Sequence, residues 1–264
     1  MVGTIVIMNL LQSVILGIVE GLSEFLPISS TGHLILASHL MQIPSTEFVK
    51  TFEIVIQFGA ILSVVFLYTK RFATNWRALL KLSVSFVVTS IIGLALYKFV
   101  KDVLLGNDLV VVASLFLGGL AMLYAERVYK PEQAAISKIE DTSWGKAVVI
   151  GIFQALAVIP GVSRSAATII GSLFLGLTRE TAVEYSFLLA VPTMAAASGL
   201  DLVKTHMAFT GTEIMVLLVG CVVSFVVAVV AIKSFLAYVQ RHNFNAFAIY
   251  RIAAAIAYFL LVIR

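Results

Sequence analysis

Charged residues are scarce in this chain of 264 residues, which also has one cysteine and only five prolines. Charged side chains make up 12% of the sequence, whereas soluble domains carry about 25%. Hydrophobic residues make up 61%, and the mean hydropathy is +1.06. This composition excludes an ordinary soluble domain and predicts an all-α polytopic membrane protein.

Two further absences narrow the class of protein. A single cysteine, Cys221, excludes a disulfide within the chain and a metal site built from thiolates, and we interpret it as a packing residue. The N-terminus lacks a basic segment and a cleavage site of small residues. We therefore expect no removable signal peptide and count the N-terminus as part of the fold.

Six stretches are apolar enough to cross a bilayer, which takes about 20 residues per helix. They are residues 51–69, 80–99, 109–126, 181–203, 213–236 and 246–263. Two more apolar stretches, 4–43 and 145–177, are interrupted by charged residues and proline. A broken helix is tolerated at membrane depth only where protein or water satisfies its backbone. We therefore predict two re-entrant helical hairpins beside six transmembrane helices.

The chain also carries a faint internal duplication. The matching pairs are Gly17 with Gly151, Ile18 with Ile152, Leu22 with Leu156, Pro27 with Pro160, and Ser30 with Ser163. Each half, 1–130 and 140–264, would hold one hairpin and three spans within a single membrane domain over 1–264. Because each half has an odd number of spans, the second half would enter the membrane from the opposite side. This predicts an inverted-topology repeat, in which the binding site lies where the two repeats meet.

The distribution of basic residues predicts how the chain is oriented in the membrane. Most lysines and arginines fall on one side of the predicted spans, in and near the loops around 70–81 and 127–146. The positive-inside rule makes that side cytoplasmic and puts both termini and the mouth of hairpin 4–43 on the outer face. Because no basic patch is interleaved with aromatic residues, we expect no nucleic-acid partner.

Residues 20–33 concentrate ionisable and hydroxyl groups in this apolar chain. Glu20 and Glu24 lie four residues apart, on one face of a helix. Ionisable groups at membrane depth cost about 2.5–3.5 kcal/mol each on insertion scales, so they mark functional sites. The pair could hold a hard divalent cation, Mg²⁺ or Ca²⁺, or act as acid and base. The alternative is a solvated pair at the interface.

Pro27 ends that helix, and a turn of small hydroxyl residues follows. Ser29, Ser30 and Thr31 lead into a second helix that contains His33. Hydroxyls and free N–H groups at a helix start favour phosphate binding, although one of them could serve only as a helix cap. We interpret His33 as an acid, a base or a phosphate ligand.

The second hairpin places Arg164 between Ser163 and Ser165, at the position that matches the first turn. A buried arginine needs an anion, and its planar fork suits phosphate oxygens. The alternative is an ion pair with Glu20, Glu24 or Glu53. One tip is therefore predicted to be acidic and metal-binding, and the other cationic and phosphate-binding.

Three polar residues of the spans are harder to interpret. Glu53 and Gln57, again four apart in the first span, either support the site or lie at the interface. Arg251, in the last span, is expected to pair with an acid or to extend to the headgroups.

In these residues the sequence resembles the bacterial undecaprenyl-diphosphatases of the bacitracin-resistance type, over nearly its whole length. The segments that carry the resemblance are Glu20 to His33, Thr51 to Gln57, Pro160 to Ser165, Glu184 to Pro192 and Phe247 to Arg251. The resemblance implies hydrolysis of undecaprenyl diphosphate to the monophosphate carrier lipid of peptidoglycan synthesis. It also implies a divalent cation, bacitracin resistance, and a multi-pass protein of the inner membrane with its site open outward.

The resemblance carries functional roles to individual positions. Glu20, Glu24, Ser30, His33 and Arg164 are the expected catalytic residues, with Glu20 and Glu24 holding the metal. Around them we expect Ser29, Thr31, Ser163, Ser165, Glu53 and Gln57 to bind the substrate. Ser30 would attack the terminal phosphorus with His33 moving a proton, while attack by metal-activated water stays open, as does a homodimer.

Two rival functions have to be weighed. A transporter or flippase for a polyprenyl phosphate would share the inverted repeat, but it would not need paired carboxylates beside a nucleophile. A lipid phosphatase of the acid-phosphatase type would carry Ser-Gly-His, whereas Thr31 separates Ser30 from Gly32 here.

Overall fold

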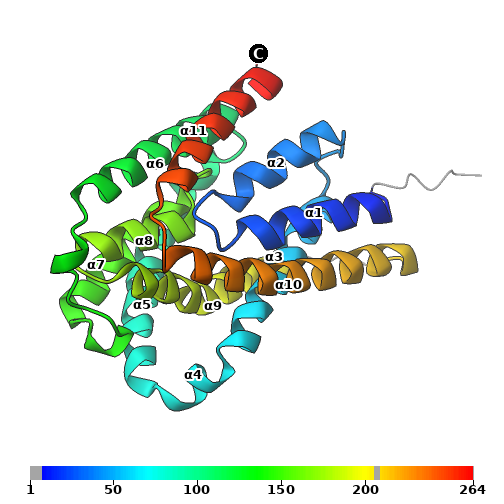
Figure 1. The fold of residues 1–264 in the computed structure, drawn as a ribbon. Helices are drawn as coiled ribbons and strands as arrows, with labels where there is room; N and C mark the ends of the chain where they lie inside the picture. Colours follow the sequence, from blue (N-terminus) through cyan, green and yellow to red (C-terminus); the bar gives the residue numbers. More distant parts are fainter. Residues whose placement is uncertain (1–7, 205–208, 264) are drawn as a thin grey trace, which may run out of the picture.

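The computed structural model describes residues 8–204 and 209–263, and within these ranges the chain is built of helices without a β-strand. The α-helices are α1 (Leu10–Ser23), α2 (Ser30–Leu40), α3 (Glu47–Leu67), α4 (Thr69–Thr74), α5 (Trp76–Phe99), α6 (Asp108–Val128), α7 (Trp144–Ala155), α8 (Arg164–Phe174), α9 (Arg179–Lys204), α10 (Gly211–Val239) and α11 (Asn245–Tyr258). Short π or 3-10 turns are η1 (Val100–Leu104), η2 (Pro131–Gln133), η3 (Ile139–Asp141), η4 (Leu156–Val158) and η5 (Phe259–Ile263). Figure 1 shows their arrangement.

Five of the described helices are long and apolar enough to cross a membrane: α3, α5 with η1, α6, α10 and α11 with η5. They coincide with five of the six predicted spans, so the prediction of an all-α membrane protein is confirmed. The sixth predicted span, 181–203, falls on α9, which has 26 residues but is not among these five. The count of six spans stays a prediction.

Both interrupted stretches fold as two short helices separated by a break. α1 and α2 are joined through Pro27, and α7 and α8 through η4 and Pro160. Proline lacks an N–H and clashes with the preceding turn, so a helix ends before it. Residues 4–7 of the predicted hairpin 4–43 lie outside the described residues.

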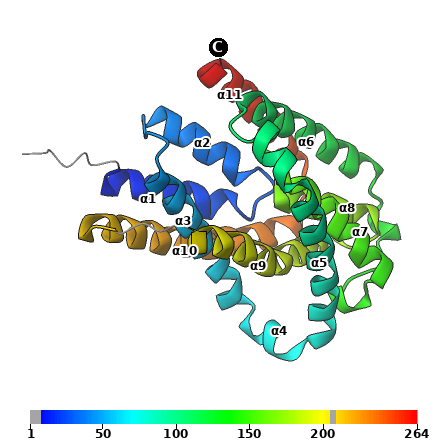
Figure 2. The same ribbon diagram turned by 180° about the vertical axis from the view of Figure 1, so that it is seen from behind.

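Helices far apart in the sequence pack side by side. α1 lies along α10, and α6 lies along α11, in both Figure 1 and Figure 2. Small residues allow the first contact: a Cβ at Gly17 would lie 2.8 Å from the Gly220 carbonyl oxygen, and one at Gly21 would lie 2.6 Å from that of Ser224. Such close backbone approach is how helices associate where lipid is as apolar as the side chains.

The largest cluster of buried hydrophobic side chains includes Phe25, which belongs to the break between α1 and α2. Phe25 packs edge-on against Phe187, with ring centroids 5.4 Å apart, and both are fully buried. Phe235 and Phe244 extend this cluster from α10 to the start of α11. The core therefore fixes the first break, at Phe25, against α9 and α10.

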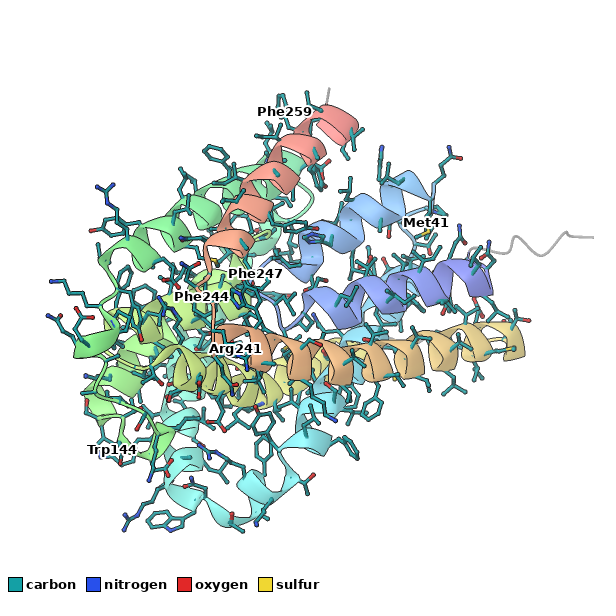
Figure 3. All side chains as sticks on the ribbon, viewed as in Figure 1. Met41, Trp144, Arg241, Phe244, Phe247 and Phe259 are labelled. Carbon is teal, nitrogen blue, oxygen red and sulfur yellow. The ribbon has the colours of Figure 1, made fainter. Side chains whose placement is uncertain are left out.

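The molecule has two opposite ends. In Figure 3, Trp144 lies at the lower left, whereas Phe259 lies at the top and Met41 at the right. The tryptophans Trp76 and Trp144 are 63% and 53% exposed, as is common for aromatic residues at a membrane interface.

Candidate active site

The starts of α2 and α8 meet at a cavity of about 300 Å³. Its lining includes seven of the residues predicted for the site: Glu24, Ser29, Ser30, Thr31, Gln57, Ser163 and Arg164. Helix N-termini expose unpaired N–H groups and the positive end of the helix dipole. Two of them at one cavity favour an anionic ligand there.

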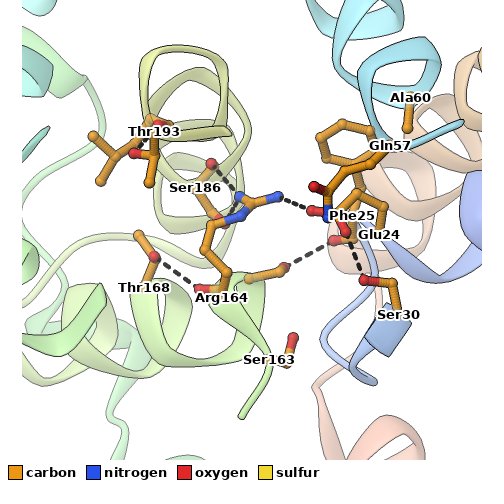
Figure 4. A network of polar contacts seen from close by, with 12 residues as sticks. Glu24, Phe25, Ser30, Gln57, Ala60, Ser163, Arg164, Thr168, Ser186 and Thr193 are labelled. Atoms are coloured by element: carbon orange, nitrogen blue, oxygen red, sulfur yellow. Dashed lines mark hydrogen bonds and ion pairs between the residues drawn. The ribbon is translucent and has the colours of Figure 1, made fainter. Parts of the chain in front are cut away.

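Glu24 joins the two breaks. Arg164 Nη2 donates to its Oε1 at 2.9 Å, and the Ser30 hydroxyl donates to its Oε2 at 2.6 Å (Figure 4). The Glu24 and Arg164 side chains are only 5% and 11% exposed. The ion pair considered as an alternative for Arg164 is therefore present, and it lies in the cavity that the phosphate interpretation requires.

Arg164 is held from the other side by α9. Its Nη1 donates to the Ser186 carbonyl oxygen at 2.8 Å, and its guanidinium lies 5.7 Å from the centre of the Phe25 ring. Nε is buried and donates to no atom of the described residues. Since guanidinium has five N–H donors, Arg164 keeps hydrogen-bonding capacity for a ligand while it is paired with Glu24.

Ser29 is strained where the chain enters α2. Its φ of 75° falls in a region that non-glycine residues rarely adopt, at a cost of about 1–3 kcal/mol. The His33 ring contacts the Ser29 carbonyl oxygen through Nδ1 at 2.7 Å and Tyr250 Oη through Nε2 at 2.7 Å. A carbonyl only accepts, so Nδ1 carries the hydrogen. His33 therefore holds the backbone beside Ser30.

Glu20 lies one turn before Glu24 and is fully buried. Neither of its carboxyl oxygens has a hydrogen-bond partner among the described residues. Its charged neighbours are Glu53, Arg164 and Glu24, whose carboxyl group is close enough to form a hydrogen bond with that of Glu20 when one of the two is protonated. A buried carboxylate without a donor is costly, so this position requires a proton or a cation.

Four predicted site residues do not line the cavity: Glu20, His33, Glu53 and Ser165. Ser165 donates to the Phe25 carbonyl oxygen at 2.8 Å and so links the two breaks. Ser163 lines the cavity, but its hydroxyl also caps α8 by accepting from the Ala166 N–H at 3.1 Å. The structure thus brings seven of the predicted residues to one cavity, and these four lie outside its lining.

Comparison with known proteins places the chain in a family. Residues 13–257 match the family model "Bacitracin resistance protein BacA". The chain belongs to the BacA family. It is 48% identical to an undecaprenyl-diphosphatase of Aquifex aeolicus over 94% of this chain and 96% of the relative. It is 48% identical to that of Bdellovibrio bacteriovorus over 97% of each, and 45% identical to that of Thermus thermophilus over 96% and 97%.

This BacA-family chain has polar cavity residues that the sequence reasoning missed. Gln154 donates to Thr89 Oγ1 at 3.1 Å and to Thr193 Oγ1 at 3.0 Å, and all three line the cavity. One signal could have identified Gln154, because the predicted duplication pairs it with Glu20. At the position that the predicted duplication pairs with Glu20, the chain therefore has a neutral amide.

Arg251 neither pairs with an acid in the described residues nor extends to the headgroups, so its predicted role was wrong. It is fully buried and donates to backbone carbonyls instead of reaching the headgroups. The acceptors are those of Leu115 at 3.4 Å, Pro27 at 3.3 Å, Ser114 at 3.1 Å and Gly161 at 3.3 Å. Pro27 and Gly161 belong to the two breaks, so one arginine on α11 fixes both to α6.

Proposed function

We propose that this protein hydrolyses undecaprenyl diphosphate to undecaprenyl phosphate and inorganic phosphate. The observation that carries the proposal is the Ser30–Glu24–Arg164 cluster, in which a hydroxyl, a carboxylate and a guanidinium lie within hydrogen-bond distance at one buried cavity. The relatives bear the name of this activity. The family description connects such proteins with bacitracin resistance.

Ser30 has the contacts of an activated nucleophile. Glu24 Oε2 accepts its hydroxyl hydrogen at 2.6 Å, within reach for proton transfer. In our proposal Ser30 Oγ bonds to the terminal phosphorus as its proton passes to Glu24, and the bond from that phosphorus to the bridging oxygen breaks. Undecaprenyl phosphate leaves, and water then releases phosphate from Ser30.

Arg164 supplies positive charge where the phosphoryl group gains negative charge. Its guanidinium donates to Glu24, which also binds Ser30 at the start of α2, and its buried Nε donates to no atom in the described part of the chain. A fixed donor in a site sheltered from water stabilises a transition state far more than the same donor in water. The Glu24 contact also aligns the guanidinium, so the two residues act as one unit.

Glu20 fits a divalent cation. Its two oxygens are buried and unpartnered in the described part of the chain, whereas both Glu24 oxygens already accept hydrogen bonds. The described residues hold no cluster of three acidic, histidine or cysteine ligands. Mg²⁺ takes only one or two carboxylates from a protein. Glu20 and Glu24, one turn apart, would supply them, and of the two Glu24 lines the cavity. When bound, the cation would neutralise charge on the diphosphate.

Chelation tests the cation proposal. We expect EDTA to abolish phosphate release and Mg²⁺ or Ca²⁺ to restore it. Glu20→Gln should raise the cation concentration for half-maximal activity by at least about 10–100-fold. Mutating a residue that only hydrogen-bonds a metal ligand already lowers metal affinity by that factor. Glu47→Gln, on an exposed carboxylate of α3, is the matched control. Full activity in EDTA would contradict the proposal.

We further propose that the chain is an inverted repeat with two re-entrant hairpins. α1 against α10 and α5 against α7 would be equivalent pairs. Ser13 donates to the Val216 carbonyl oxygen at 2.7 Å in one pair, and Ser85 to that of Ala147 at 2.6 Å in the other. The serine lies on the hairpin helix in the first pair and on the span in the second, so these two bonds are not equivalent. The support comes from Gly17 and its match Gly151, where a Cβ would lie 2.8 Å from the Gly220 carbonyl oxygen and 2.6 Å from that of Ser85.

The proposed location is the bacterial inner membrane, with the cavity open to the outer face. A labelling experiment tests this orientation. In a Cys221→Ser background, Ser45→Cys and Ser137→Cys place single cysteines in exposed loops at either end. On intact spheroplasts, a membrane-impermeant maleimide should label residue 45 and reach residue 137 only after lysis. The opposite pattern would reverse the proposed orientation.

Transport of a polyprenyl phosphate is the competing function. Transport requires phosphate binding but no hydroxyl aligned on a carboxylate, so the Ser30–Glu24 contact favours hydrolysis. We expect purified protein to release phosphate from undecaprenyl diphosphate in detergent, where no second leaflet exists. A protein that only redistributes labelled lipid between the leaflets of liposomes, without release, would support the transporter.

A further inference from the structure

A second cavity, of about 180 Å³, lies between α5 and the end of α7. Its lining is apolar throughout: Ile92, Leu96, Phe99, Val100, Leu104, Ile152, Ala155, Leu156, Val158 and Ile159. We call it the α5–α7 groove. It offers a ligand no charge and no hydrogen bond, so only a hydrocarbon suits it.

The α5–α7 groove adjoins the polar cavity. Val158 lines both. On α5, Thr89 lines the polar cavity. The groove residues Ile92, Leu96 and Val100 follow it at spacings of three and four residues, so all four lie on the same side of the helix. A molecule with a polar end beside Thr89 and an apolar tail along this stripe would meet matching chemistry throughout.

Gly93 of α5 faces Val158, the residue that the two cavities share. The nearest side-chain atom to a Cβ placed there is Val158 Cγ1, at 3.5 Å, an ordinary contact. Alanine therefore fits at this position, while a longer side chain would enter the space between α5 and Val158. A longer side chain at Gly93 would therefore press on Val158, the residue that lines both cavities.

We propose that the α5–α7 groove holds the first isoprenyl units of the diphosphate substrate, while the rest of the chain lies in lipid. The inference rests on the proposed function and adds the path by which the tail leaves the site. Lipid is as apolar as the groove, so little affinity comes from burial. The groove would instead orient the scissile phosphate, since a misplacement of about 1 Å can cost about a hundredfold in rate.

A matched pair of tryptophan variants tests the groove. Leu96 lines it, whereas Leu94 on the same helix is 71% exposed and lines neither cavity. We expect Leu96→Trp to lower kcat/KM for undecaprenyl and farnesyl diphosphate about tenfold to a hundredfold, and to leave methyl diphosphate unaffected. Leu94→Trp should match the wild type on every substrate. An equal loss on all three substrates, or equal behaviour of both variants, would overturn the proposal.

The junction provides an independent test. Gly93→Leu should reduce release from the prenyl substrates, while Gly93→Ala should retain it. A farnesyl diphosphate analogue with a photoreactive group on its first isoprenyl unit should crosslink to peptides 92–104 and 152–159. Crosslinks confined to α1, α10, α6 or α11 would overturn the groove. If the wild type releases no phosphate from undecaprenyl diphosphate, the proposed function itself fails.

Discussion

Glu24→Gln should lower phosphate release from undecaprenyl diphosphate by about a hundredfold to ten-thousandfold, the range that general bases supply. The amide keeps the size of the side chain and can still accept from Arg164, but it cannot take the proton of Ser30. The two contacts, at 2.9 Å and 2.6 Å, meet on different oxygens of this one carboxylate. Steady-state assays at saturating cation measure the loss, which should appear in kcat.

Two companion variants make the result interpretable. Glu47→Gln removes a carboxylate at the start of α3 that is 75% exposed and pairs with Lys50, so it should leave kcat unchanged. Ser30→Ala should match the loss in Glu24→Gln, because the two residues act in one step and their effects do not add. If Glu24→Gln and Arg164→Ala both kept wild-type release, the proposed site would be wrong.

Hydropathy sufficed to predict most of the fold. The predicted spans 109–126 and 213–236 fall within α6 and α10, because a membrane helix needs a long apolar run and little else. The hairpin breaks were predictable for the same reason, since Pro27 and Pro160 interrupt such runs. The pairing of α1 with α10 was not, because it depends on close contacts at Gly17 and Gly21 that periodicity does not reveal.

The sequence predicted which residues belong to the site but not which of them bond to each other. Acidic and basic groups in an apolar chain are few, so Glu24 and Arg164 were identified at once. Which carboxylate meets Arg164 depends on the side-chain geometry of α1, and sequence left Glu20, Glu24 and Glu53 open. His33 was assigned to chemistry because it lies near Ser30 in sequence. Its ring contacts the Ser29 carbonyl oxygen and also Tyr250, on a helix that sequence spacing could not bring close, and its catalytic role stays a prediction.

Arg251→Met should destabilise the protein and lower kcat together. Methionine fills a similar volume but leaves buried carbonyl oxygens of both breaks and of α6 without a donor, and each buried polar group left unpaired costs about 1–3 kcal/mol. We expect a clearly lower unfolding temperature in detergent. We also expect lower kcat at temperatures where the variant is folded, because the starts of α2 and α8 lose their common anchor.

Rescue by the conservative variant separates positioning from general stability. Arg251→Lys keeps the charge and three donors, but one ammonium cannot reach acceptors as widely spread as those of Pro27, Ser114 and Gly161. It should therefore recover more of the unfolding temperature than of kcat. Arg127→Met, at an exposed arginine on α6, should change neither. If Arg251→Lys recovered the unfolding temperature and kcat to the same extent, Arg251 would have only a structural role, because activity would then follow the folded fraction alone.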